Sequence, residues 1–472
     1  MVNTAENALR EHFEPMKQAY LRAPSPSYVQ RRTHLDALSD LLRSNQQALA
    51  DAIAADFGGR SIHETRLAEI LLPLAAIKYI RDHLRNWMKP QSRRVPFSFR
   101  LGKAKVFYQP LGVVGIISPW NYPVQLAIEP AAYALAAGNR VLVKPSELTP
   151  HTADLLRRLV SQHFHHEVMA IITGGPDVAE AFSQLPFDHI LFTGSTHVGR
   201  IVMKAAAENL VPVTLELGGK SPTILHDSFP LEQAAKRIVF GKWANAGQTC
   251  IAPDYVLVSQ GNHDAFIQEL VKATRTAYPT IKDNPDYTSI INRGHYERLC
   301  NLIADAEEKG ARNIVINADD ENISDEAHRL PPTLLLNVRD DMTVMQDEIF
   351  GPILPIMAHR SLDEALAYVN NHPRPLALYY FDRDRQRACD VLQRTISGGV
   401  SVNDIALHFF IDDLPFGGVG ASGMGRYHGF DGFETFSHKK PAFLQSRFNL
   451  TGLFSAPYGE RVNTVMNVLI GR

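Results

Sequence analysis

The sequence has little cysteine, little net charge and no long apolar run. Its 3 Cys, at positions 250, 300 and 389 of 472 residues, are odd in number and far apart, which argues against a disulfide framework and fits a reducing compartment. The net charge of −2 gives no electrostatic reason to expect nucleic acid or an anionic membrane as a partner. No stretch approaches the roughly 20 apolar residues that span a bilayer, and the charged N-terminal region contains no signal-peptide core. We therefore expect a cytoplasmic protein without a membrane span.

The composition and the hydrophobic pattern are those of a globular α/β protein. Hydrophobic residues make up 45% of the chain and charged residues 21%, which excludes a disordered or fibrous chain. Residues 4–90 carry helical periodicity, and residues 91–110 alternate apolar with basic or polar side chains, as an exposed hairpin arm would. From residue 111 to about 420, strand-like runs alternate with helical patterns, with a restart near 214. This order predicts two Rossmann-like, doubly wound α/β units and an arm that pairs with another chain.

Cys250 is the candidate nucleophile. A free cysteine is more often a small buried hydrophobe, and we keep that reading for Cys300 and Cys389, which lie within helical patterns. Gly247 permits close backbone approach three residues before Cys250, and residues 237–246 look helical. Cys250 is therefore expected at a break in structure, where reactive side chains are found more often than in a core helix.

Glu216 is the candidate acid–base residue. It lies between Leu215 and Leu217 at the end of an apolar run. Burying its carboxylate is costly, so we expect either an ion-pair partner or a catalytic role. From the residues alone, a catalytic carboxylate and a salt bridge to Lys220 are equally good interpretations.

Asn121 is a candidate hydrogen-bond donor in a rigid loop. It follows Trp120 between Pro119 and Pro123, and the two prolines fix the backbone around it. An amide presented in this way can donate to a developing oxyanion. The alternative is an asparagine that merely satisfies a turn.

Several further segments could bind a dinucleotide. Gly194, Ser195 and Gly199 lie between a strand and a helix, where amide groups can receive a phosphate, although Thr196 interrupts the usual glycine pattern. The segment Lys-Pro-Ser-Glu (144–147) ends another strand, and its polar side chains could hydrogen-bond to a ribose. The segment Glu-Ile-Phe-Gly-Pro (348–352) offers a carboxylate and an aromatic ring in a rigid turn. The tract His-Phe-His-His (163–166) converges poorly on one helix face, so we expect no metal site.

Taken together, seven motifs in chain order resemble the aldehyde dehydrogenase superfamily over nearly the whole chain. Within it, three segments are similar to the class 3 and coniferyl aldehyde dehydrogenase branch: Cys-Ile-Ala-Pro-Asp-Tyr (250–255), Arg-Pro-Leu-Ala-Leu-Tyr-Tyr-Phe (374–381) and Gly-Ala-Ser-Gly-Met-Gly-Arg-Tyr-His-Gly (420–429). Asp-Phe-Gly-Gly-Arg-Ser (56–61) and Pro-Tyr-Gly (457–459) favour the coniferyl group. The seven motifs are Pro-Trp-Asn (119–121), Lys-Pro-Ser-Glu (144–147), Phe-Thr-Gly-Ser-Thr (192–196), Glu-Leu-Gly-Gly (216–219), Gly-Gln-Thr-Cys (247–250), Glu-Ile-Phe-Gly-Pro (348–352) and Pro-Phe-Gly-Gly (415–418).

The resemblance implies NAD-dependent oxidation of an aldehyde to its acid, with NADP possible as a second cofactor. Cys250 would form the thiohemiacetal and thioester, Asn121 and the Cys250 amide would hold the oxyanion, and Glu216 would activate the hydrolytic water. Asn403 matches a further position near the family's active site. The residues expected to bind the cofactor are Trp120, Lys144, Ser146, Glu147, Gly194, Ser195, Gly199, Leu217, Glu348 and Phe350.

The resemblance also implies a domain plan and a homodimer. Residues 1–90 and 109–213 would form the NAD-binding domain, residues 214–420 the catalytic domain, residues 91–108 and 421–447 the oligomerisation arm, and residues 448–472 a C-terminal tail. The expected substrate is an aromatic or cinnamyl aldehyde such as coniferaldehyde, with Tyr122, Phe409 and Phe410 as candidate lining residues that could equally be core. The alternatives are medium- or long-chain aliphatic aldehydes, an NAD-independent cysteine hydrolase, a non-catalytic paralogue and an acyl-CoA-forming enzyme.

Overall fold

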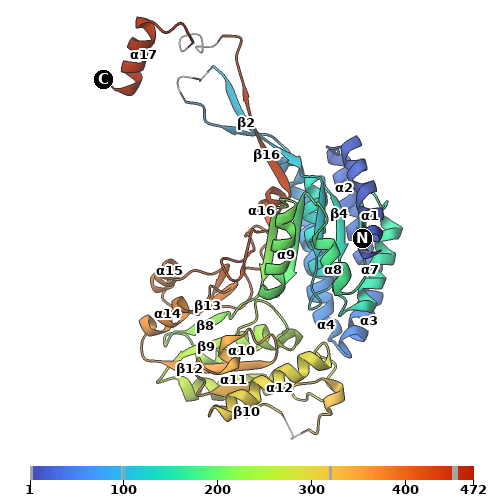
Figure 1. Ribbon diagram of the computed structural model, residues 1–472. Coiled ribbons are helices and arrows are strands. Elements are labelled where there is room, and N and C mark those ends of the chain that lie inside the picture. The colour runs from blue at the N-terminus through green and yellow to red at the C-terminus, as the bar shows by residue number, and fades with distance from the viewer. Residues whose placement is uncertain (1–3, 97–98, 100, 318–320, 449–454, 472) are drawn as a thin grey trace.

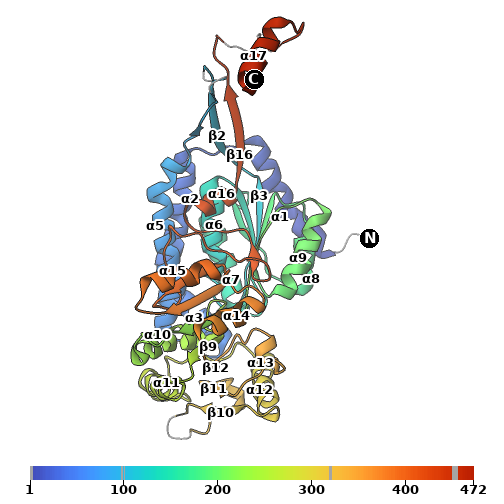
Figure 2. The ribbon, with the colours of Figure 1, turned by 90° about the vertical axis from the view of Figure 1, so that its left-hand side faces the viewer.

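The protein has two α/β units side by side and an arm that projects from the first (Figures 1 and 2). The computed structural model describes residues 4–96, 99, 101–317, 321–448 and 455–471. The chain starts with helices of the first unit, builds the first sheet, crosses to the second unit and returns to the arm. The predicted pair of doubly wound units is therefore confirmed.

The first unit is built on a six-stranded sheet with helices on both faces. Its strand order is β15-β7-β6-β3-β4-β5, and every neighbouring pair is parallel except β15 with β7. Helices α1 and α9 pack on one face, whereas α6 packs on the other beneath α2 and α5. The strands are β3 (Val113–Ile117), β4 (Arg140–Lys144), β5 (Met169–Ile171), β6 (His189–Gly194), β7 (Val213–Leu217) and β15 (Gly423–Met424). The helices are α1 (Thr4–Arg22), α2 (Tyr28–Ser44), α3 (Gln46–Phe57), α4 (Ile62–Thr65), the π-helix η1 (Arg66–Leu71), α5 (Leu72–Trp87), α6 (Gln125–Ala137), α7 (Pro150–His163), α8 (Pro176–Ser183), α9 (Thr196–Glu208) and α16 (Gly429–Thr435).

The second unit is built on a seven-stranded sheet of order β10-β11-β12-β9-β8-β13-β14, in which only β10 runs antiparallel. Its buried strands are continuously apolar, as expected for a parallel sheet covered on both faces. The strands are β8 (Pro222–Leu225), β9 (Tyr255–Ser259), β10 (Arg312–Val315), β11 (Thr333–Leu336), β12 (Ile353–His359), β13 (Ala377–Phe381) and β14 (Gly399–Val402). The helices are α10 (Leu231–Trp243), the 3₁₀ turn η3 (Ala244–Gly247), α11 (His263–Ala277), α12 (Arg293–Glu308), η5 (Asp325–Ala327), α13 (Thr343–Gln346), α14 (Leu362–Asn371) and α15 (Arg385–Arg394).

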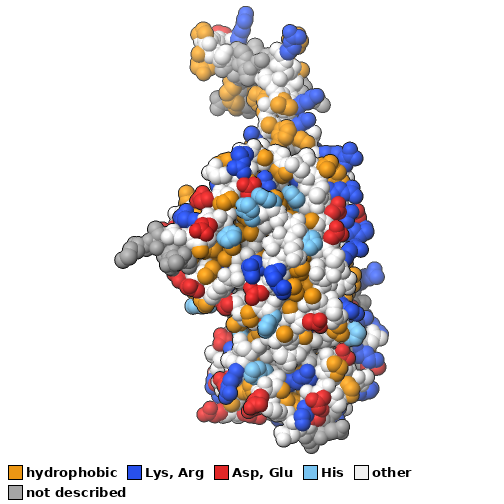
Figure 3. Space-filling view, turned by 90° about the vertical axis from the view of Figure 1, so that its right-hand side faces the viewer, with side chains coloured by type: hydrophobic (Ala, Val, Ile, Leu, Met, Phe, Trp, Pro, Cys, Tyr) orange, Lys and Arg blue, Asp and Glu red, His pale blue; other side chains and the backbone are white. Residues whose placement is uncertain are grey.

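The arm is a three-stranded antiparallel sheet of order β1-β2-β16. Its strands are β1 (Gln91–Arg93), β2 (Lys103–Pro110) and β16 (Ser437–Leu444), and beyond it the chain ends in α17 (Glu460–Ile470). Figure 3 shows the arm standing above the body with hydrophobic side chains on its surface, while Lys, Arg, Asp and Glu are interspersed over the body face in view. The hairpin predicted for residues 91–110 is therefore present, and it gains its third strand from a segment near the end of the chain.

The sheets place two domain boundaries differently from the sequence-based plan. Strand β7, which carries Glu216, is hydrogen-bonded to β6 and belongs to the first sheet, although its residues were expected to open the catalytic unit. Strand β15 and helix α16 also belong to the first unit rather than to the arm. Hydrophobic pattern alone cannot decide which of two adjacent sheets receives a buried strand.

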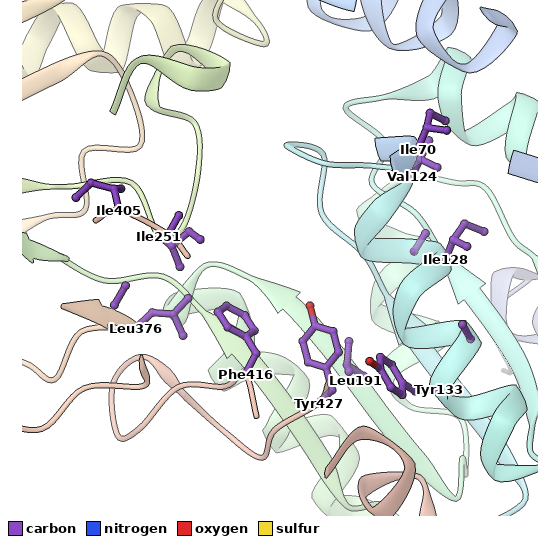
Figure 4. Packing of buried hydrophobic residues seen from close by; sticks show 14 of the residues in the cluster. Ile70, Val124, Ile128, Tyr133, Leu191, Ile251, Leu376, Ile405, Phe416 and Tyr427 are labelled. Atoms are coloured by element: carbon purple, nitrogen blue, oxygen red, sulfur yellow. The ribbon is translucent and has the colours of Figure 1, made fainter. Parts of the chain in front are cut away.

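The two units share a continuous hydrophobic core. Figure 4 shows Phe416 and Tyr427 between side chains of the second unit, such as Leu376, and those of the first, such as Leu191. Both aromatic rings are almost fully buried. The segment that returns from the second unit to the first thus joins the two units at the level of the site described next. Within the residues that the structure describes, no helix has the length and apolarity that a bilayer crossing requires.

Candidate active site

Two cavities meet at Cys250. The smaller, of about 160 Å³, is lined mainly by aromatic and aliphatic side chains of α6, α10 and the loop around Phe409. The larger, of about 880 Å³, lies along the carboxyl ends of β3 and β6 and is lined by polar and charged groups. Cys250, Glu216 and Thr193 line both cavities. The thiol therefore lies where an apolar cavity and a larger cavity adjoin.

A strained turn presents Cys250 at this junction. After α10 ends, Asn245 and Ala246 both have φ of 50° and Gly247 has φ of 72°, a left-handed conformation that non-glycine residues rarely adopt. Gln248 fixes the turn, because its Nε2 donates to Asn245 O at 2.9 Å and its Oε1 accepts from Ile291 N at 3.0 Å. The break in structure expected before Cys250 is thus confirmed.

Burial disfavours the thiolate form of Cys250. Burial raises its pKa to about 12, and the carboxylates of Glu348 and Glu216 add to the effect. Attack by this sulfur therefore requires that its proton be removed.

Glu216 is a buried carboxyl group without a hydrogen-bond partner. It lies near the end of β7, and neither carboxylate oxygen has a partner among the described residues. Burial alone raises the pKa of Glu216 well above its ordinary value. The alternative salt bridge to Lys220 is wrong, since Lys220 pairs with Asp254 and also donates to Val344 O at 2.7 Å. A carboxyl group left unpaired in a cavity is suited to proton transfer.

Asn121 presents its amide at the same place. Its Nδ2 donates to Gln248 O at 3.1 Å, which leaves the second N–H of the amide for another acceptor. The backbone carbonyl oxygen of Asn121 accepts hydrogen bonds from Arg60 Nη1 at 3.0 Å and from Asn245 Nδ2 at 3.1 Å. Asn121 lines the larger cavity together with Cys250. The side chain therefore ties its own loop to the turn before Cys250 and keeps one N–H in the cavity that Cys250 lines.

A buried ion pair, which sequence reasoning missed, holds the loop of Asn121. Arg60 and Glu69 are fully buried and 3.0 Å apart. Glu69 Oε2 accepts from Val124 N at 3.0 Å and from Gln125 N at 2.8 Å. Glu69 lies in the π-helix η1, an irregularity common at functional sites. Local sequence pattern does not reveal this pair, because Arg60 lies in the loop after α3 and Glu69 in a helical stretch, and only their packing brings the two side chains together.

The start of helix α9 forms one wall of the larger cavity. Gly194 and Ser195 line it, and the Ser195 hydroxyl caps the helix by accepting from Val198 N at 3.3 Å. Gly199 does not line the cavity. A Cβ at this position would approach Leu217 Cδ2 to 2.6 Å, so the glycine lets α9 lie close against β7. Leu217 in turn lines the smaller cavity.

Glu348, Phe350 and Trp120 also line the larger cavity. Burial raises the pKa of Glu348 to about 8, helped by the nearby Asp254 carboxylate. A Cβ on Gly218 would come within 2.0 Å of Glu348 Oε2, so only glycine permits this close packing. The rings of Phe350 and Trp120 meet edge-on with centroids 5.3 Å apart.

Lys144, Ser146 and Glu147 follow β4 at the same edge of the sheet but are not among the residues that line the larger cavity. The Lys144 ammonium lies 2.9 Å from Glu147 Oε2. Partial burial tends to raise the pKa of Glu147, but the contact with Lys144 outweighs it and the pKa is lowered. Glu147 is therefore an ionised, half-exposed carboxylate beside the site.

Asn403 does not itself line either cavity, although Ala406, three residues further along, lines the smaller one. Its amide bridges the backbone of Asp382, donating to Asp382 O and accepting from Asp382 N, each at 2.7 Å. It fixes the loop that places Ala406 in the smaller cavity. Tyr122, Phe409 and Phe410, by contrast, do line that cavity as expected. In the described part of the chain, no three His, Cys, Asp or Glu residues gather in a group that could hold a metal ion.

The sequence matches the aldehyde dehydrogenase family over residues 3–441. The chain belongs to this family. It is 52% identical to a Pseudomonas aeruginosa protein named "Probable coniferyl aldehyde dehydrogenase", with 99% of this chain and 97% of that protein covered. It is 47% identical to the coniferyl aldehyde dehydrogenase of a Pseudomonas species, with 97% and 95% covered.

Solved structures of the family share the whole fold. The substrate-bound state of Staphylococcus aureus AldH has a TM-score of 0.92 at 40% identity and covers 98% of this chain and 99% of that chain. The indole-3-acetaldehyde dehydrogenase AldA of P. syringae, in complex with NAD⁺ and IAA, has a TM-score of 0.84 at 26% identity, with 93% and 89% covered. The family resemblance noted from the seven motifs is confirmed.

Proposed function

We propose that this aldehyde dehydrogenase oxidises a cinnamyl-type aromatic aldehyde, such as coniferaldehyde, to its carboxylic acid with NAD. The observation that carries the proposal is the meeting of an aromatic-lined cavity and a larger polar cavity at one sulfur atom, Cys250. Aldehyde oxidation follows from the family and from this geometry. The aromatic substrate rests on the lining residues and on the names of the relatives.

The larger cavity fits a dinucleotide. Its volume suits a cofactor, the amide groups at the start of α9 and Arg200 offer positive potential to a pyrophosphate, and Glu348 offers a carboxylate to a ribose hydroxyl. Bound NAD supplies the acceptor for the hydride that leaves the carbon attached to Cys250. Glu147 and Lys144 would hold the second ribose at the neighbouring strand end, and Trp120 and Phe350 would pack beside the nicotinamide end.

In the first step, Cys250 Sγ attacks the aldehyde carbon and forms a thiohemiacetal. The thiol proton has to leave for the solvent of the larger cavity as the bond forms. The free N–H of Asn121 and the Cys250 amide would donate to the oxygen as it gains charge. One such donor is typically worth about 3–4 kcal/mol.

In the last step, water hydrolyses the thioester. Glu216 accepts a proton from the water, and the water oxygen adds to the thioester carbon. The C–S bond then breaks and releases the acid, and the proton passes from Glu216 to the departing sulfur, which regenerates the Cys250 thiol and the Glu216 carboxylate. Burial raises the pKa of Glu216, which makes it a stronger base than a carboxylate with an ordinary pKa. A carboxyl group at this position also argues against transfer to coenzyme A, which needs no water activation.

The preference between NAD and NADP is expected to depend on Glu147. An ionised carboxylate near the ribose accepts from a 2′-hydroxyl and repels a 2′-phosphate. In the Glu147→Gln enzyme, the ratio of kcat/KM with NADP to that with NAD should rise about tenfold, which corresponds to ~1.4 kcal/mol. Glu180→Gln, on the exposed face of α8, is the matched control. An unchanged ratio in Glu147→Gln would remove this carboxylate from cofactor choice.

The substrate class is tested by comparing coniferaldehyde, benzaldehyde and octanal under saturating NAD. We expect kcat/KM for coniferaldehyde to exceed that for octanal by about tenfold or more, because ring contacts with residues such as Phe409 and Tyr122 are each worth about 0.5–1.5 kcal/mol. Benzaldehyde should fall between the two, since its ring reaches less of the cavity. A preference for octanal would replace the aromatic substrate with an aliphatic one and leave the chemistry at Cys250 unchanged.

We also propose that the protein is a cytoplasmic homodimer formed through the arm. The sheet β1-β2-β16 projects from the body, and β16 leaves one edge unpaired within the described part of the chain. Phe443 and Leu444 are about half exposed on this strand. An exposed edge with apolar side chains is typical of a strand that pairs with a second copy. The three cysteines are free thiols, as in a reducing compartment.

A further inference from the structure

Gln125 brings a side-chain amide into the wall of the aromatic cavity. It is the first residue of α6, lines the smaller cavity and is almost fully buried. Its backbone N–H donates to Glu69, so the residue is anchored by the same ion pair that holds the Asn121 loop. Its side-chain Nε2 donates to Glu129 Oε2 at 3.2 Å.

Glu129 determines which way the Gln125 amide faces. Glu129 lies one helical turn further along α6, is buried and does not line the described cavity. Its second oxygen, Oε1, lies 2.9 Å from Nε2 of the buried His428. A carboxylate in this position can only accept hydrogen bonds, so the NH₂ group of Gln125 must face it. The amide carbonyl, Oε1, is then directed to the remaining side.

His428 links this pair to the opposite wall of the cavity. Its ring stacks on Phe416 with centroids 5.4 Å apart and packs edge-on against Tyr427 at 4.6 Å. Both of these aromatic residues line the same cavity as Gln125. The series Gln125–Glu129–His428 therefore ties an amide on one wall to the aromatic rings on the other.

The carbonyl oxygen of Gln125 is an acceptor without a donor. Among the described residues, no hydrogen bond reaches Gln125 Oε1. Other unpaired acceptors of this cavity are Glu64 Oε1 and the Glu216 carboxyl group, which are acidic groups, and Glu216 serves the reacting end beside Cys250. An acceptor in an apolar cavity is stabilised when a ligand hydroxyl donates to it. An aliphatic aldehyde carries no such donor, but a phenolic ring does.

We infer that Gln125, oriented by Glu129 and His428, accepts a hydrogen bond from the ring hydroxyl of a hydroxylated aromatic aldehyde. The inference rests on the proposed oxidation of an aromatic aldehyde and adds the feature by which the ring is recognised. Gln125 contacts the substrate, and Glu129 and His428 are positioning residues. A site built to receive a hydroxyl group discriminates strongly against the analogue that lacks it.

The experiment compares coniferaldehyde with 3-methoxycinnamaldehyde, which differs only by the missing 4-hydroxyl group. For the wild type, we expect kcat/KM to favour coniferaldehyde by about tenfold or more. In Gln125→Leu this ratio should fall to about 1–2, mainly through KM for coniferaldehyde. In Glu129→Gln the ratio should fall part of the way, because an amide at position 129 no longer dictates how Gln125 faces. Gln162→Leu, on the exposed surface of α7, is the control and should keep the wild-type ratio.

Each outcome decides between the two proposals. A wild-type ratio near 1 with coniferaldehyde still preferred over octanal would overturn the hydroxyl site and leave the aromatic substrate in place. An unchanged ratio in Gln125→Leu would likewise overturn it. Octanal preferred over both cinnamaldehydes would overturn the aromatic proposal itself. The wild-type ratio and Glu129→Gln keep the test valid if Gln125→Leu does not fold.

Discussion

Replacing Cys250 with Ser is expected to lower kcat by about 1,000-fold or more, as removal of a catalytic nucleophile does elsewhere. Serine is the smallest change that removes the sulfur, but its hydroxyl is a far weaker nucleophile than a thiol and leaves more slowly from an acyl intermediate. Among the described residues, the Cys250 side chain makes no hydrogen bond or ion pair with another side chain, so the variant should fold and bind NAD with the wild-type Kd. The measurements are kcat with coniferaldehyde and NAD binding by fluorescence quenching.

Cys389→Ser is the matched control, because Cys389 lies exposed on α15 and lines neither cavity. It should keep wild-type kcat. If Cys250→Ser retained more than about a tenth of wild-type turnover, covalent catalysis at this sulfur would be excluded, and every role assigned to the neighbouring residues would have to be reconsidered.

The Glu216→Gln enzyme is expected to release one equivalent of NADH per active site in a rapid burst and then nearly stop. Glutamine cannot take a proton from water, so hydrolysis of the thioester should slow by about 10²–10⁴-fold, the usual contribution of a general base. The thioester should accumulate and be detected as a mass increase on Cys250 after acid quenching. Glu232→Gln, on the exposed face of α10, should show neither effect.

Linear turnover without a burst would mean that Glu216 acts before hydride transfer instead, and full steady-state activity would exclude it as the base.

The Glu216→Gln variant also carries a prediction on stability. Burial raises the pKa of Glu216, so below about pH 4.3 both the folded and the unfolded wild type hold this proton, and the Glu216→Gln substitution should change the free energy of unfolding little. As the pH rises, only the unfolded chain ionises freely, and the wild type loses stability relative to Glu216→Gln. The Tm difference should therefore grow from pH 4 to pH 8.

The residues around Cys250 show which parts of the site could be read from the chain. A nucleophile after a glycine-containing turn, an amide between two prolines and a carboxylate at the end of an apolar strand each have local signatures. Lys220 shows the limit of this reasoning. Lys220 lies only four positions after Glu216, yet the two side chains do not pair. Strands β7 and β8 belong to different sheets, and Lys220 forms its ion pair with Asp254.

The walls of the two cavities depend on contacts between residues that are far apart in the chain, which local sequence patterns do not reveal. Gln125, Glu129 and His428 meet across about 300 positions of sequence, and Arg60 reaches Asn121 from the preceding helical region. Propensity and periodicity report on neighbours within a few positions, so such pairs are invisible to them.

By itself, the sequence determined that the chain forms two doubly wound α/β units with an arm, and it pointed to Cys250, Glu216 and Asn121, because hydrophobic period and turn chemistry act over short distances. Only the tertiary structure decided that β7 joins the first sheet, that the candidate catalytic carboxyl group is unpaired, and that an oriented amide faces the aromatic cavity. Those features arise from packing between elements that are far apart in the chain, where burial and shape rather than local preference set the free energy.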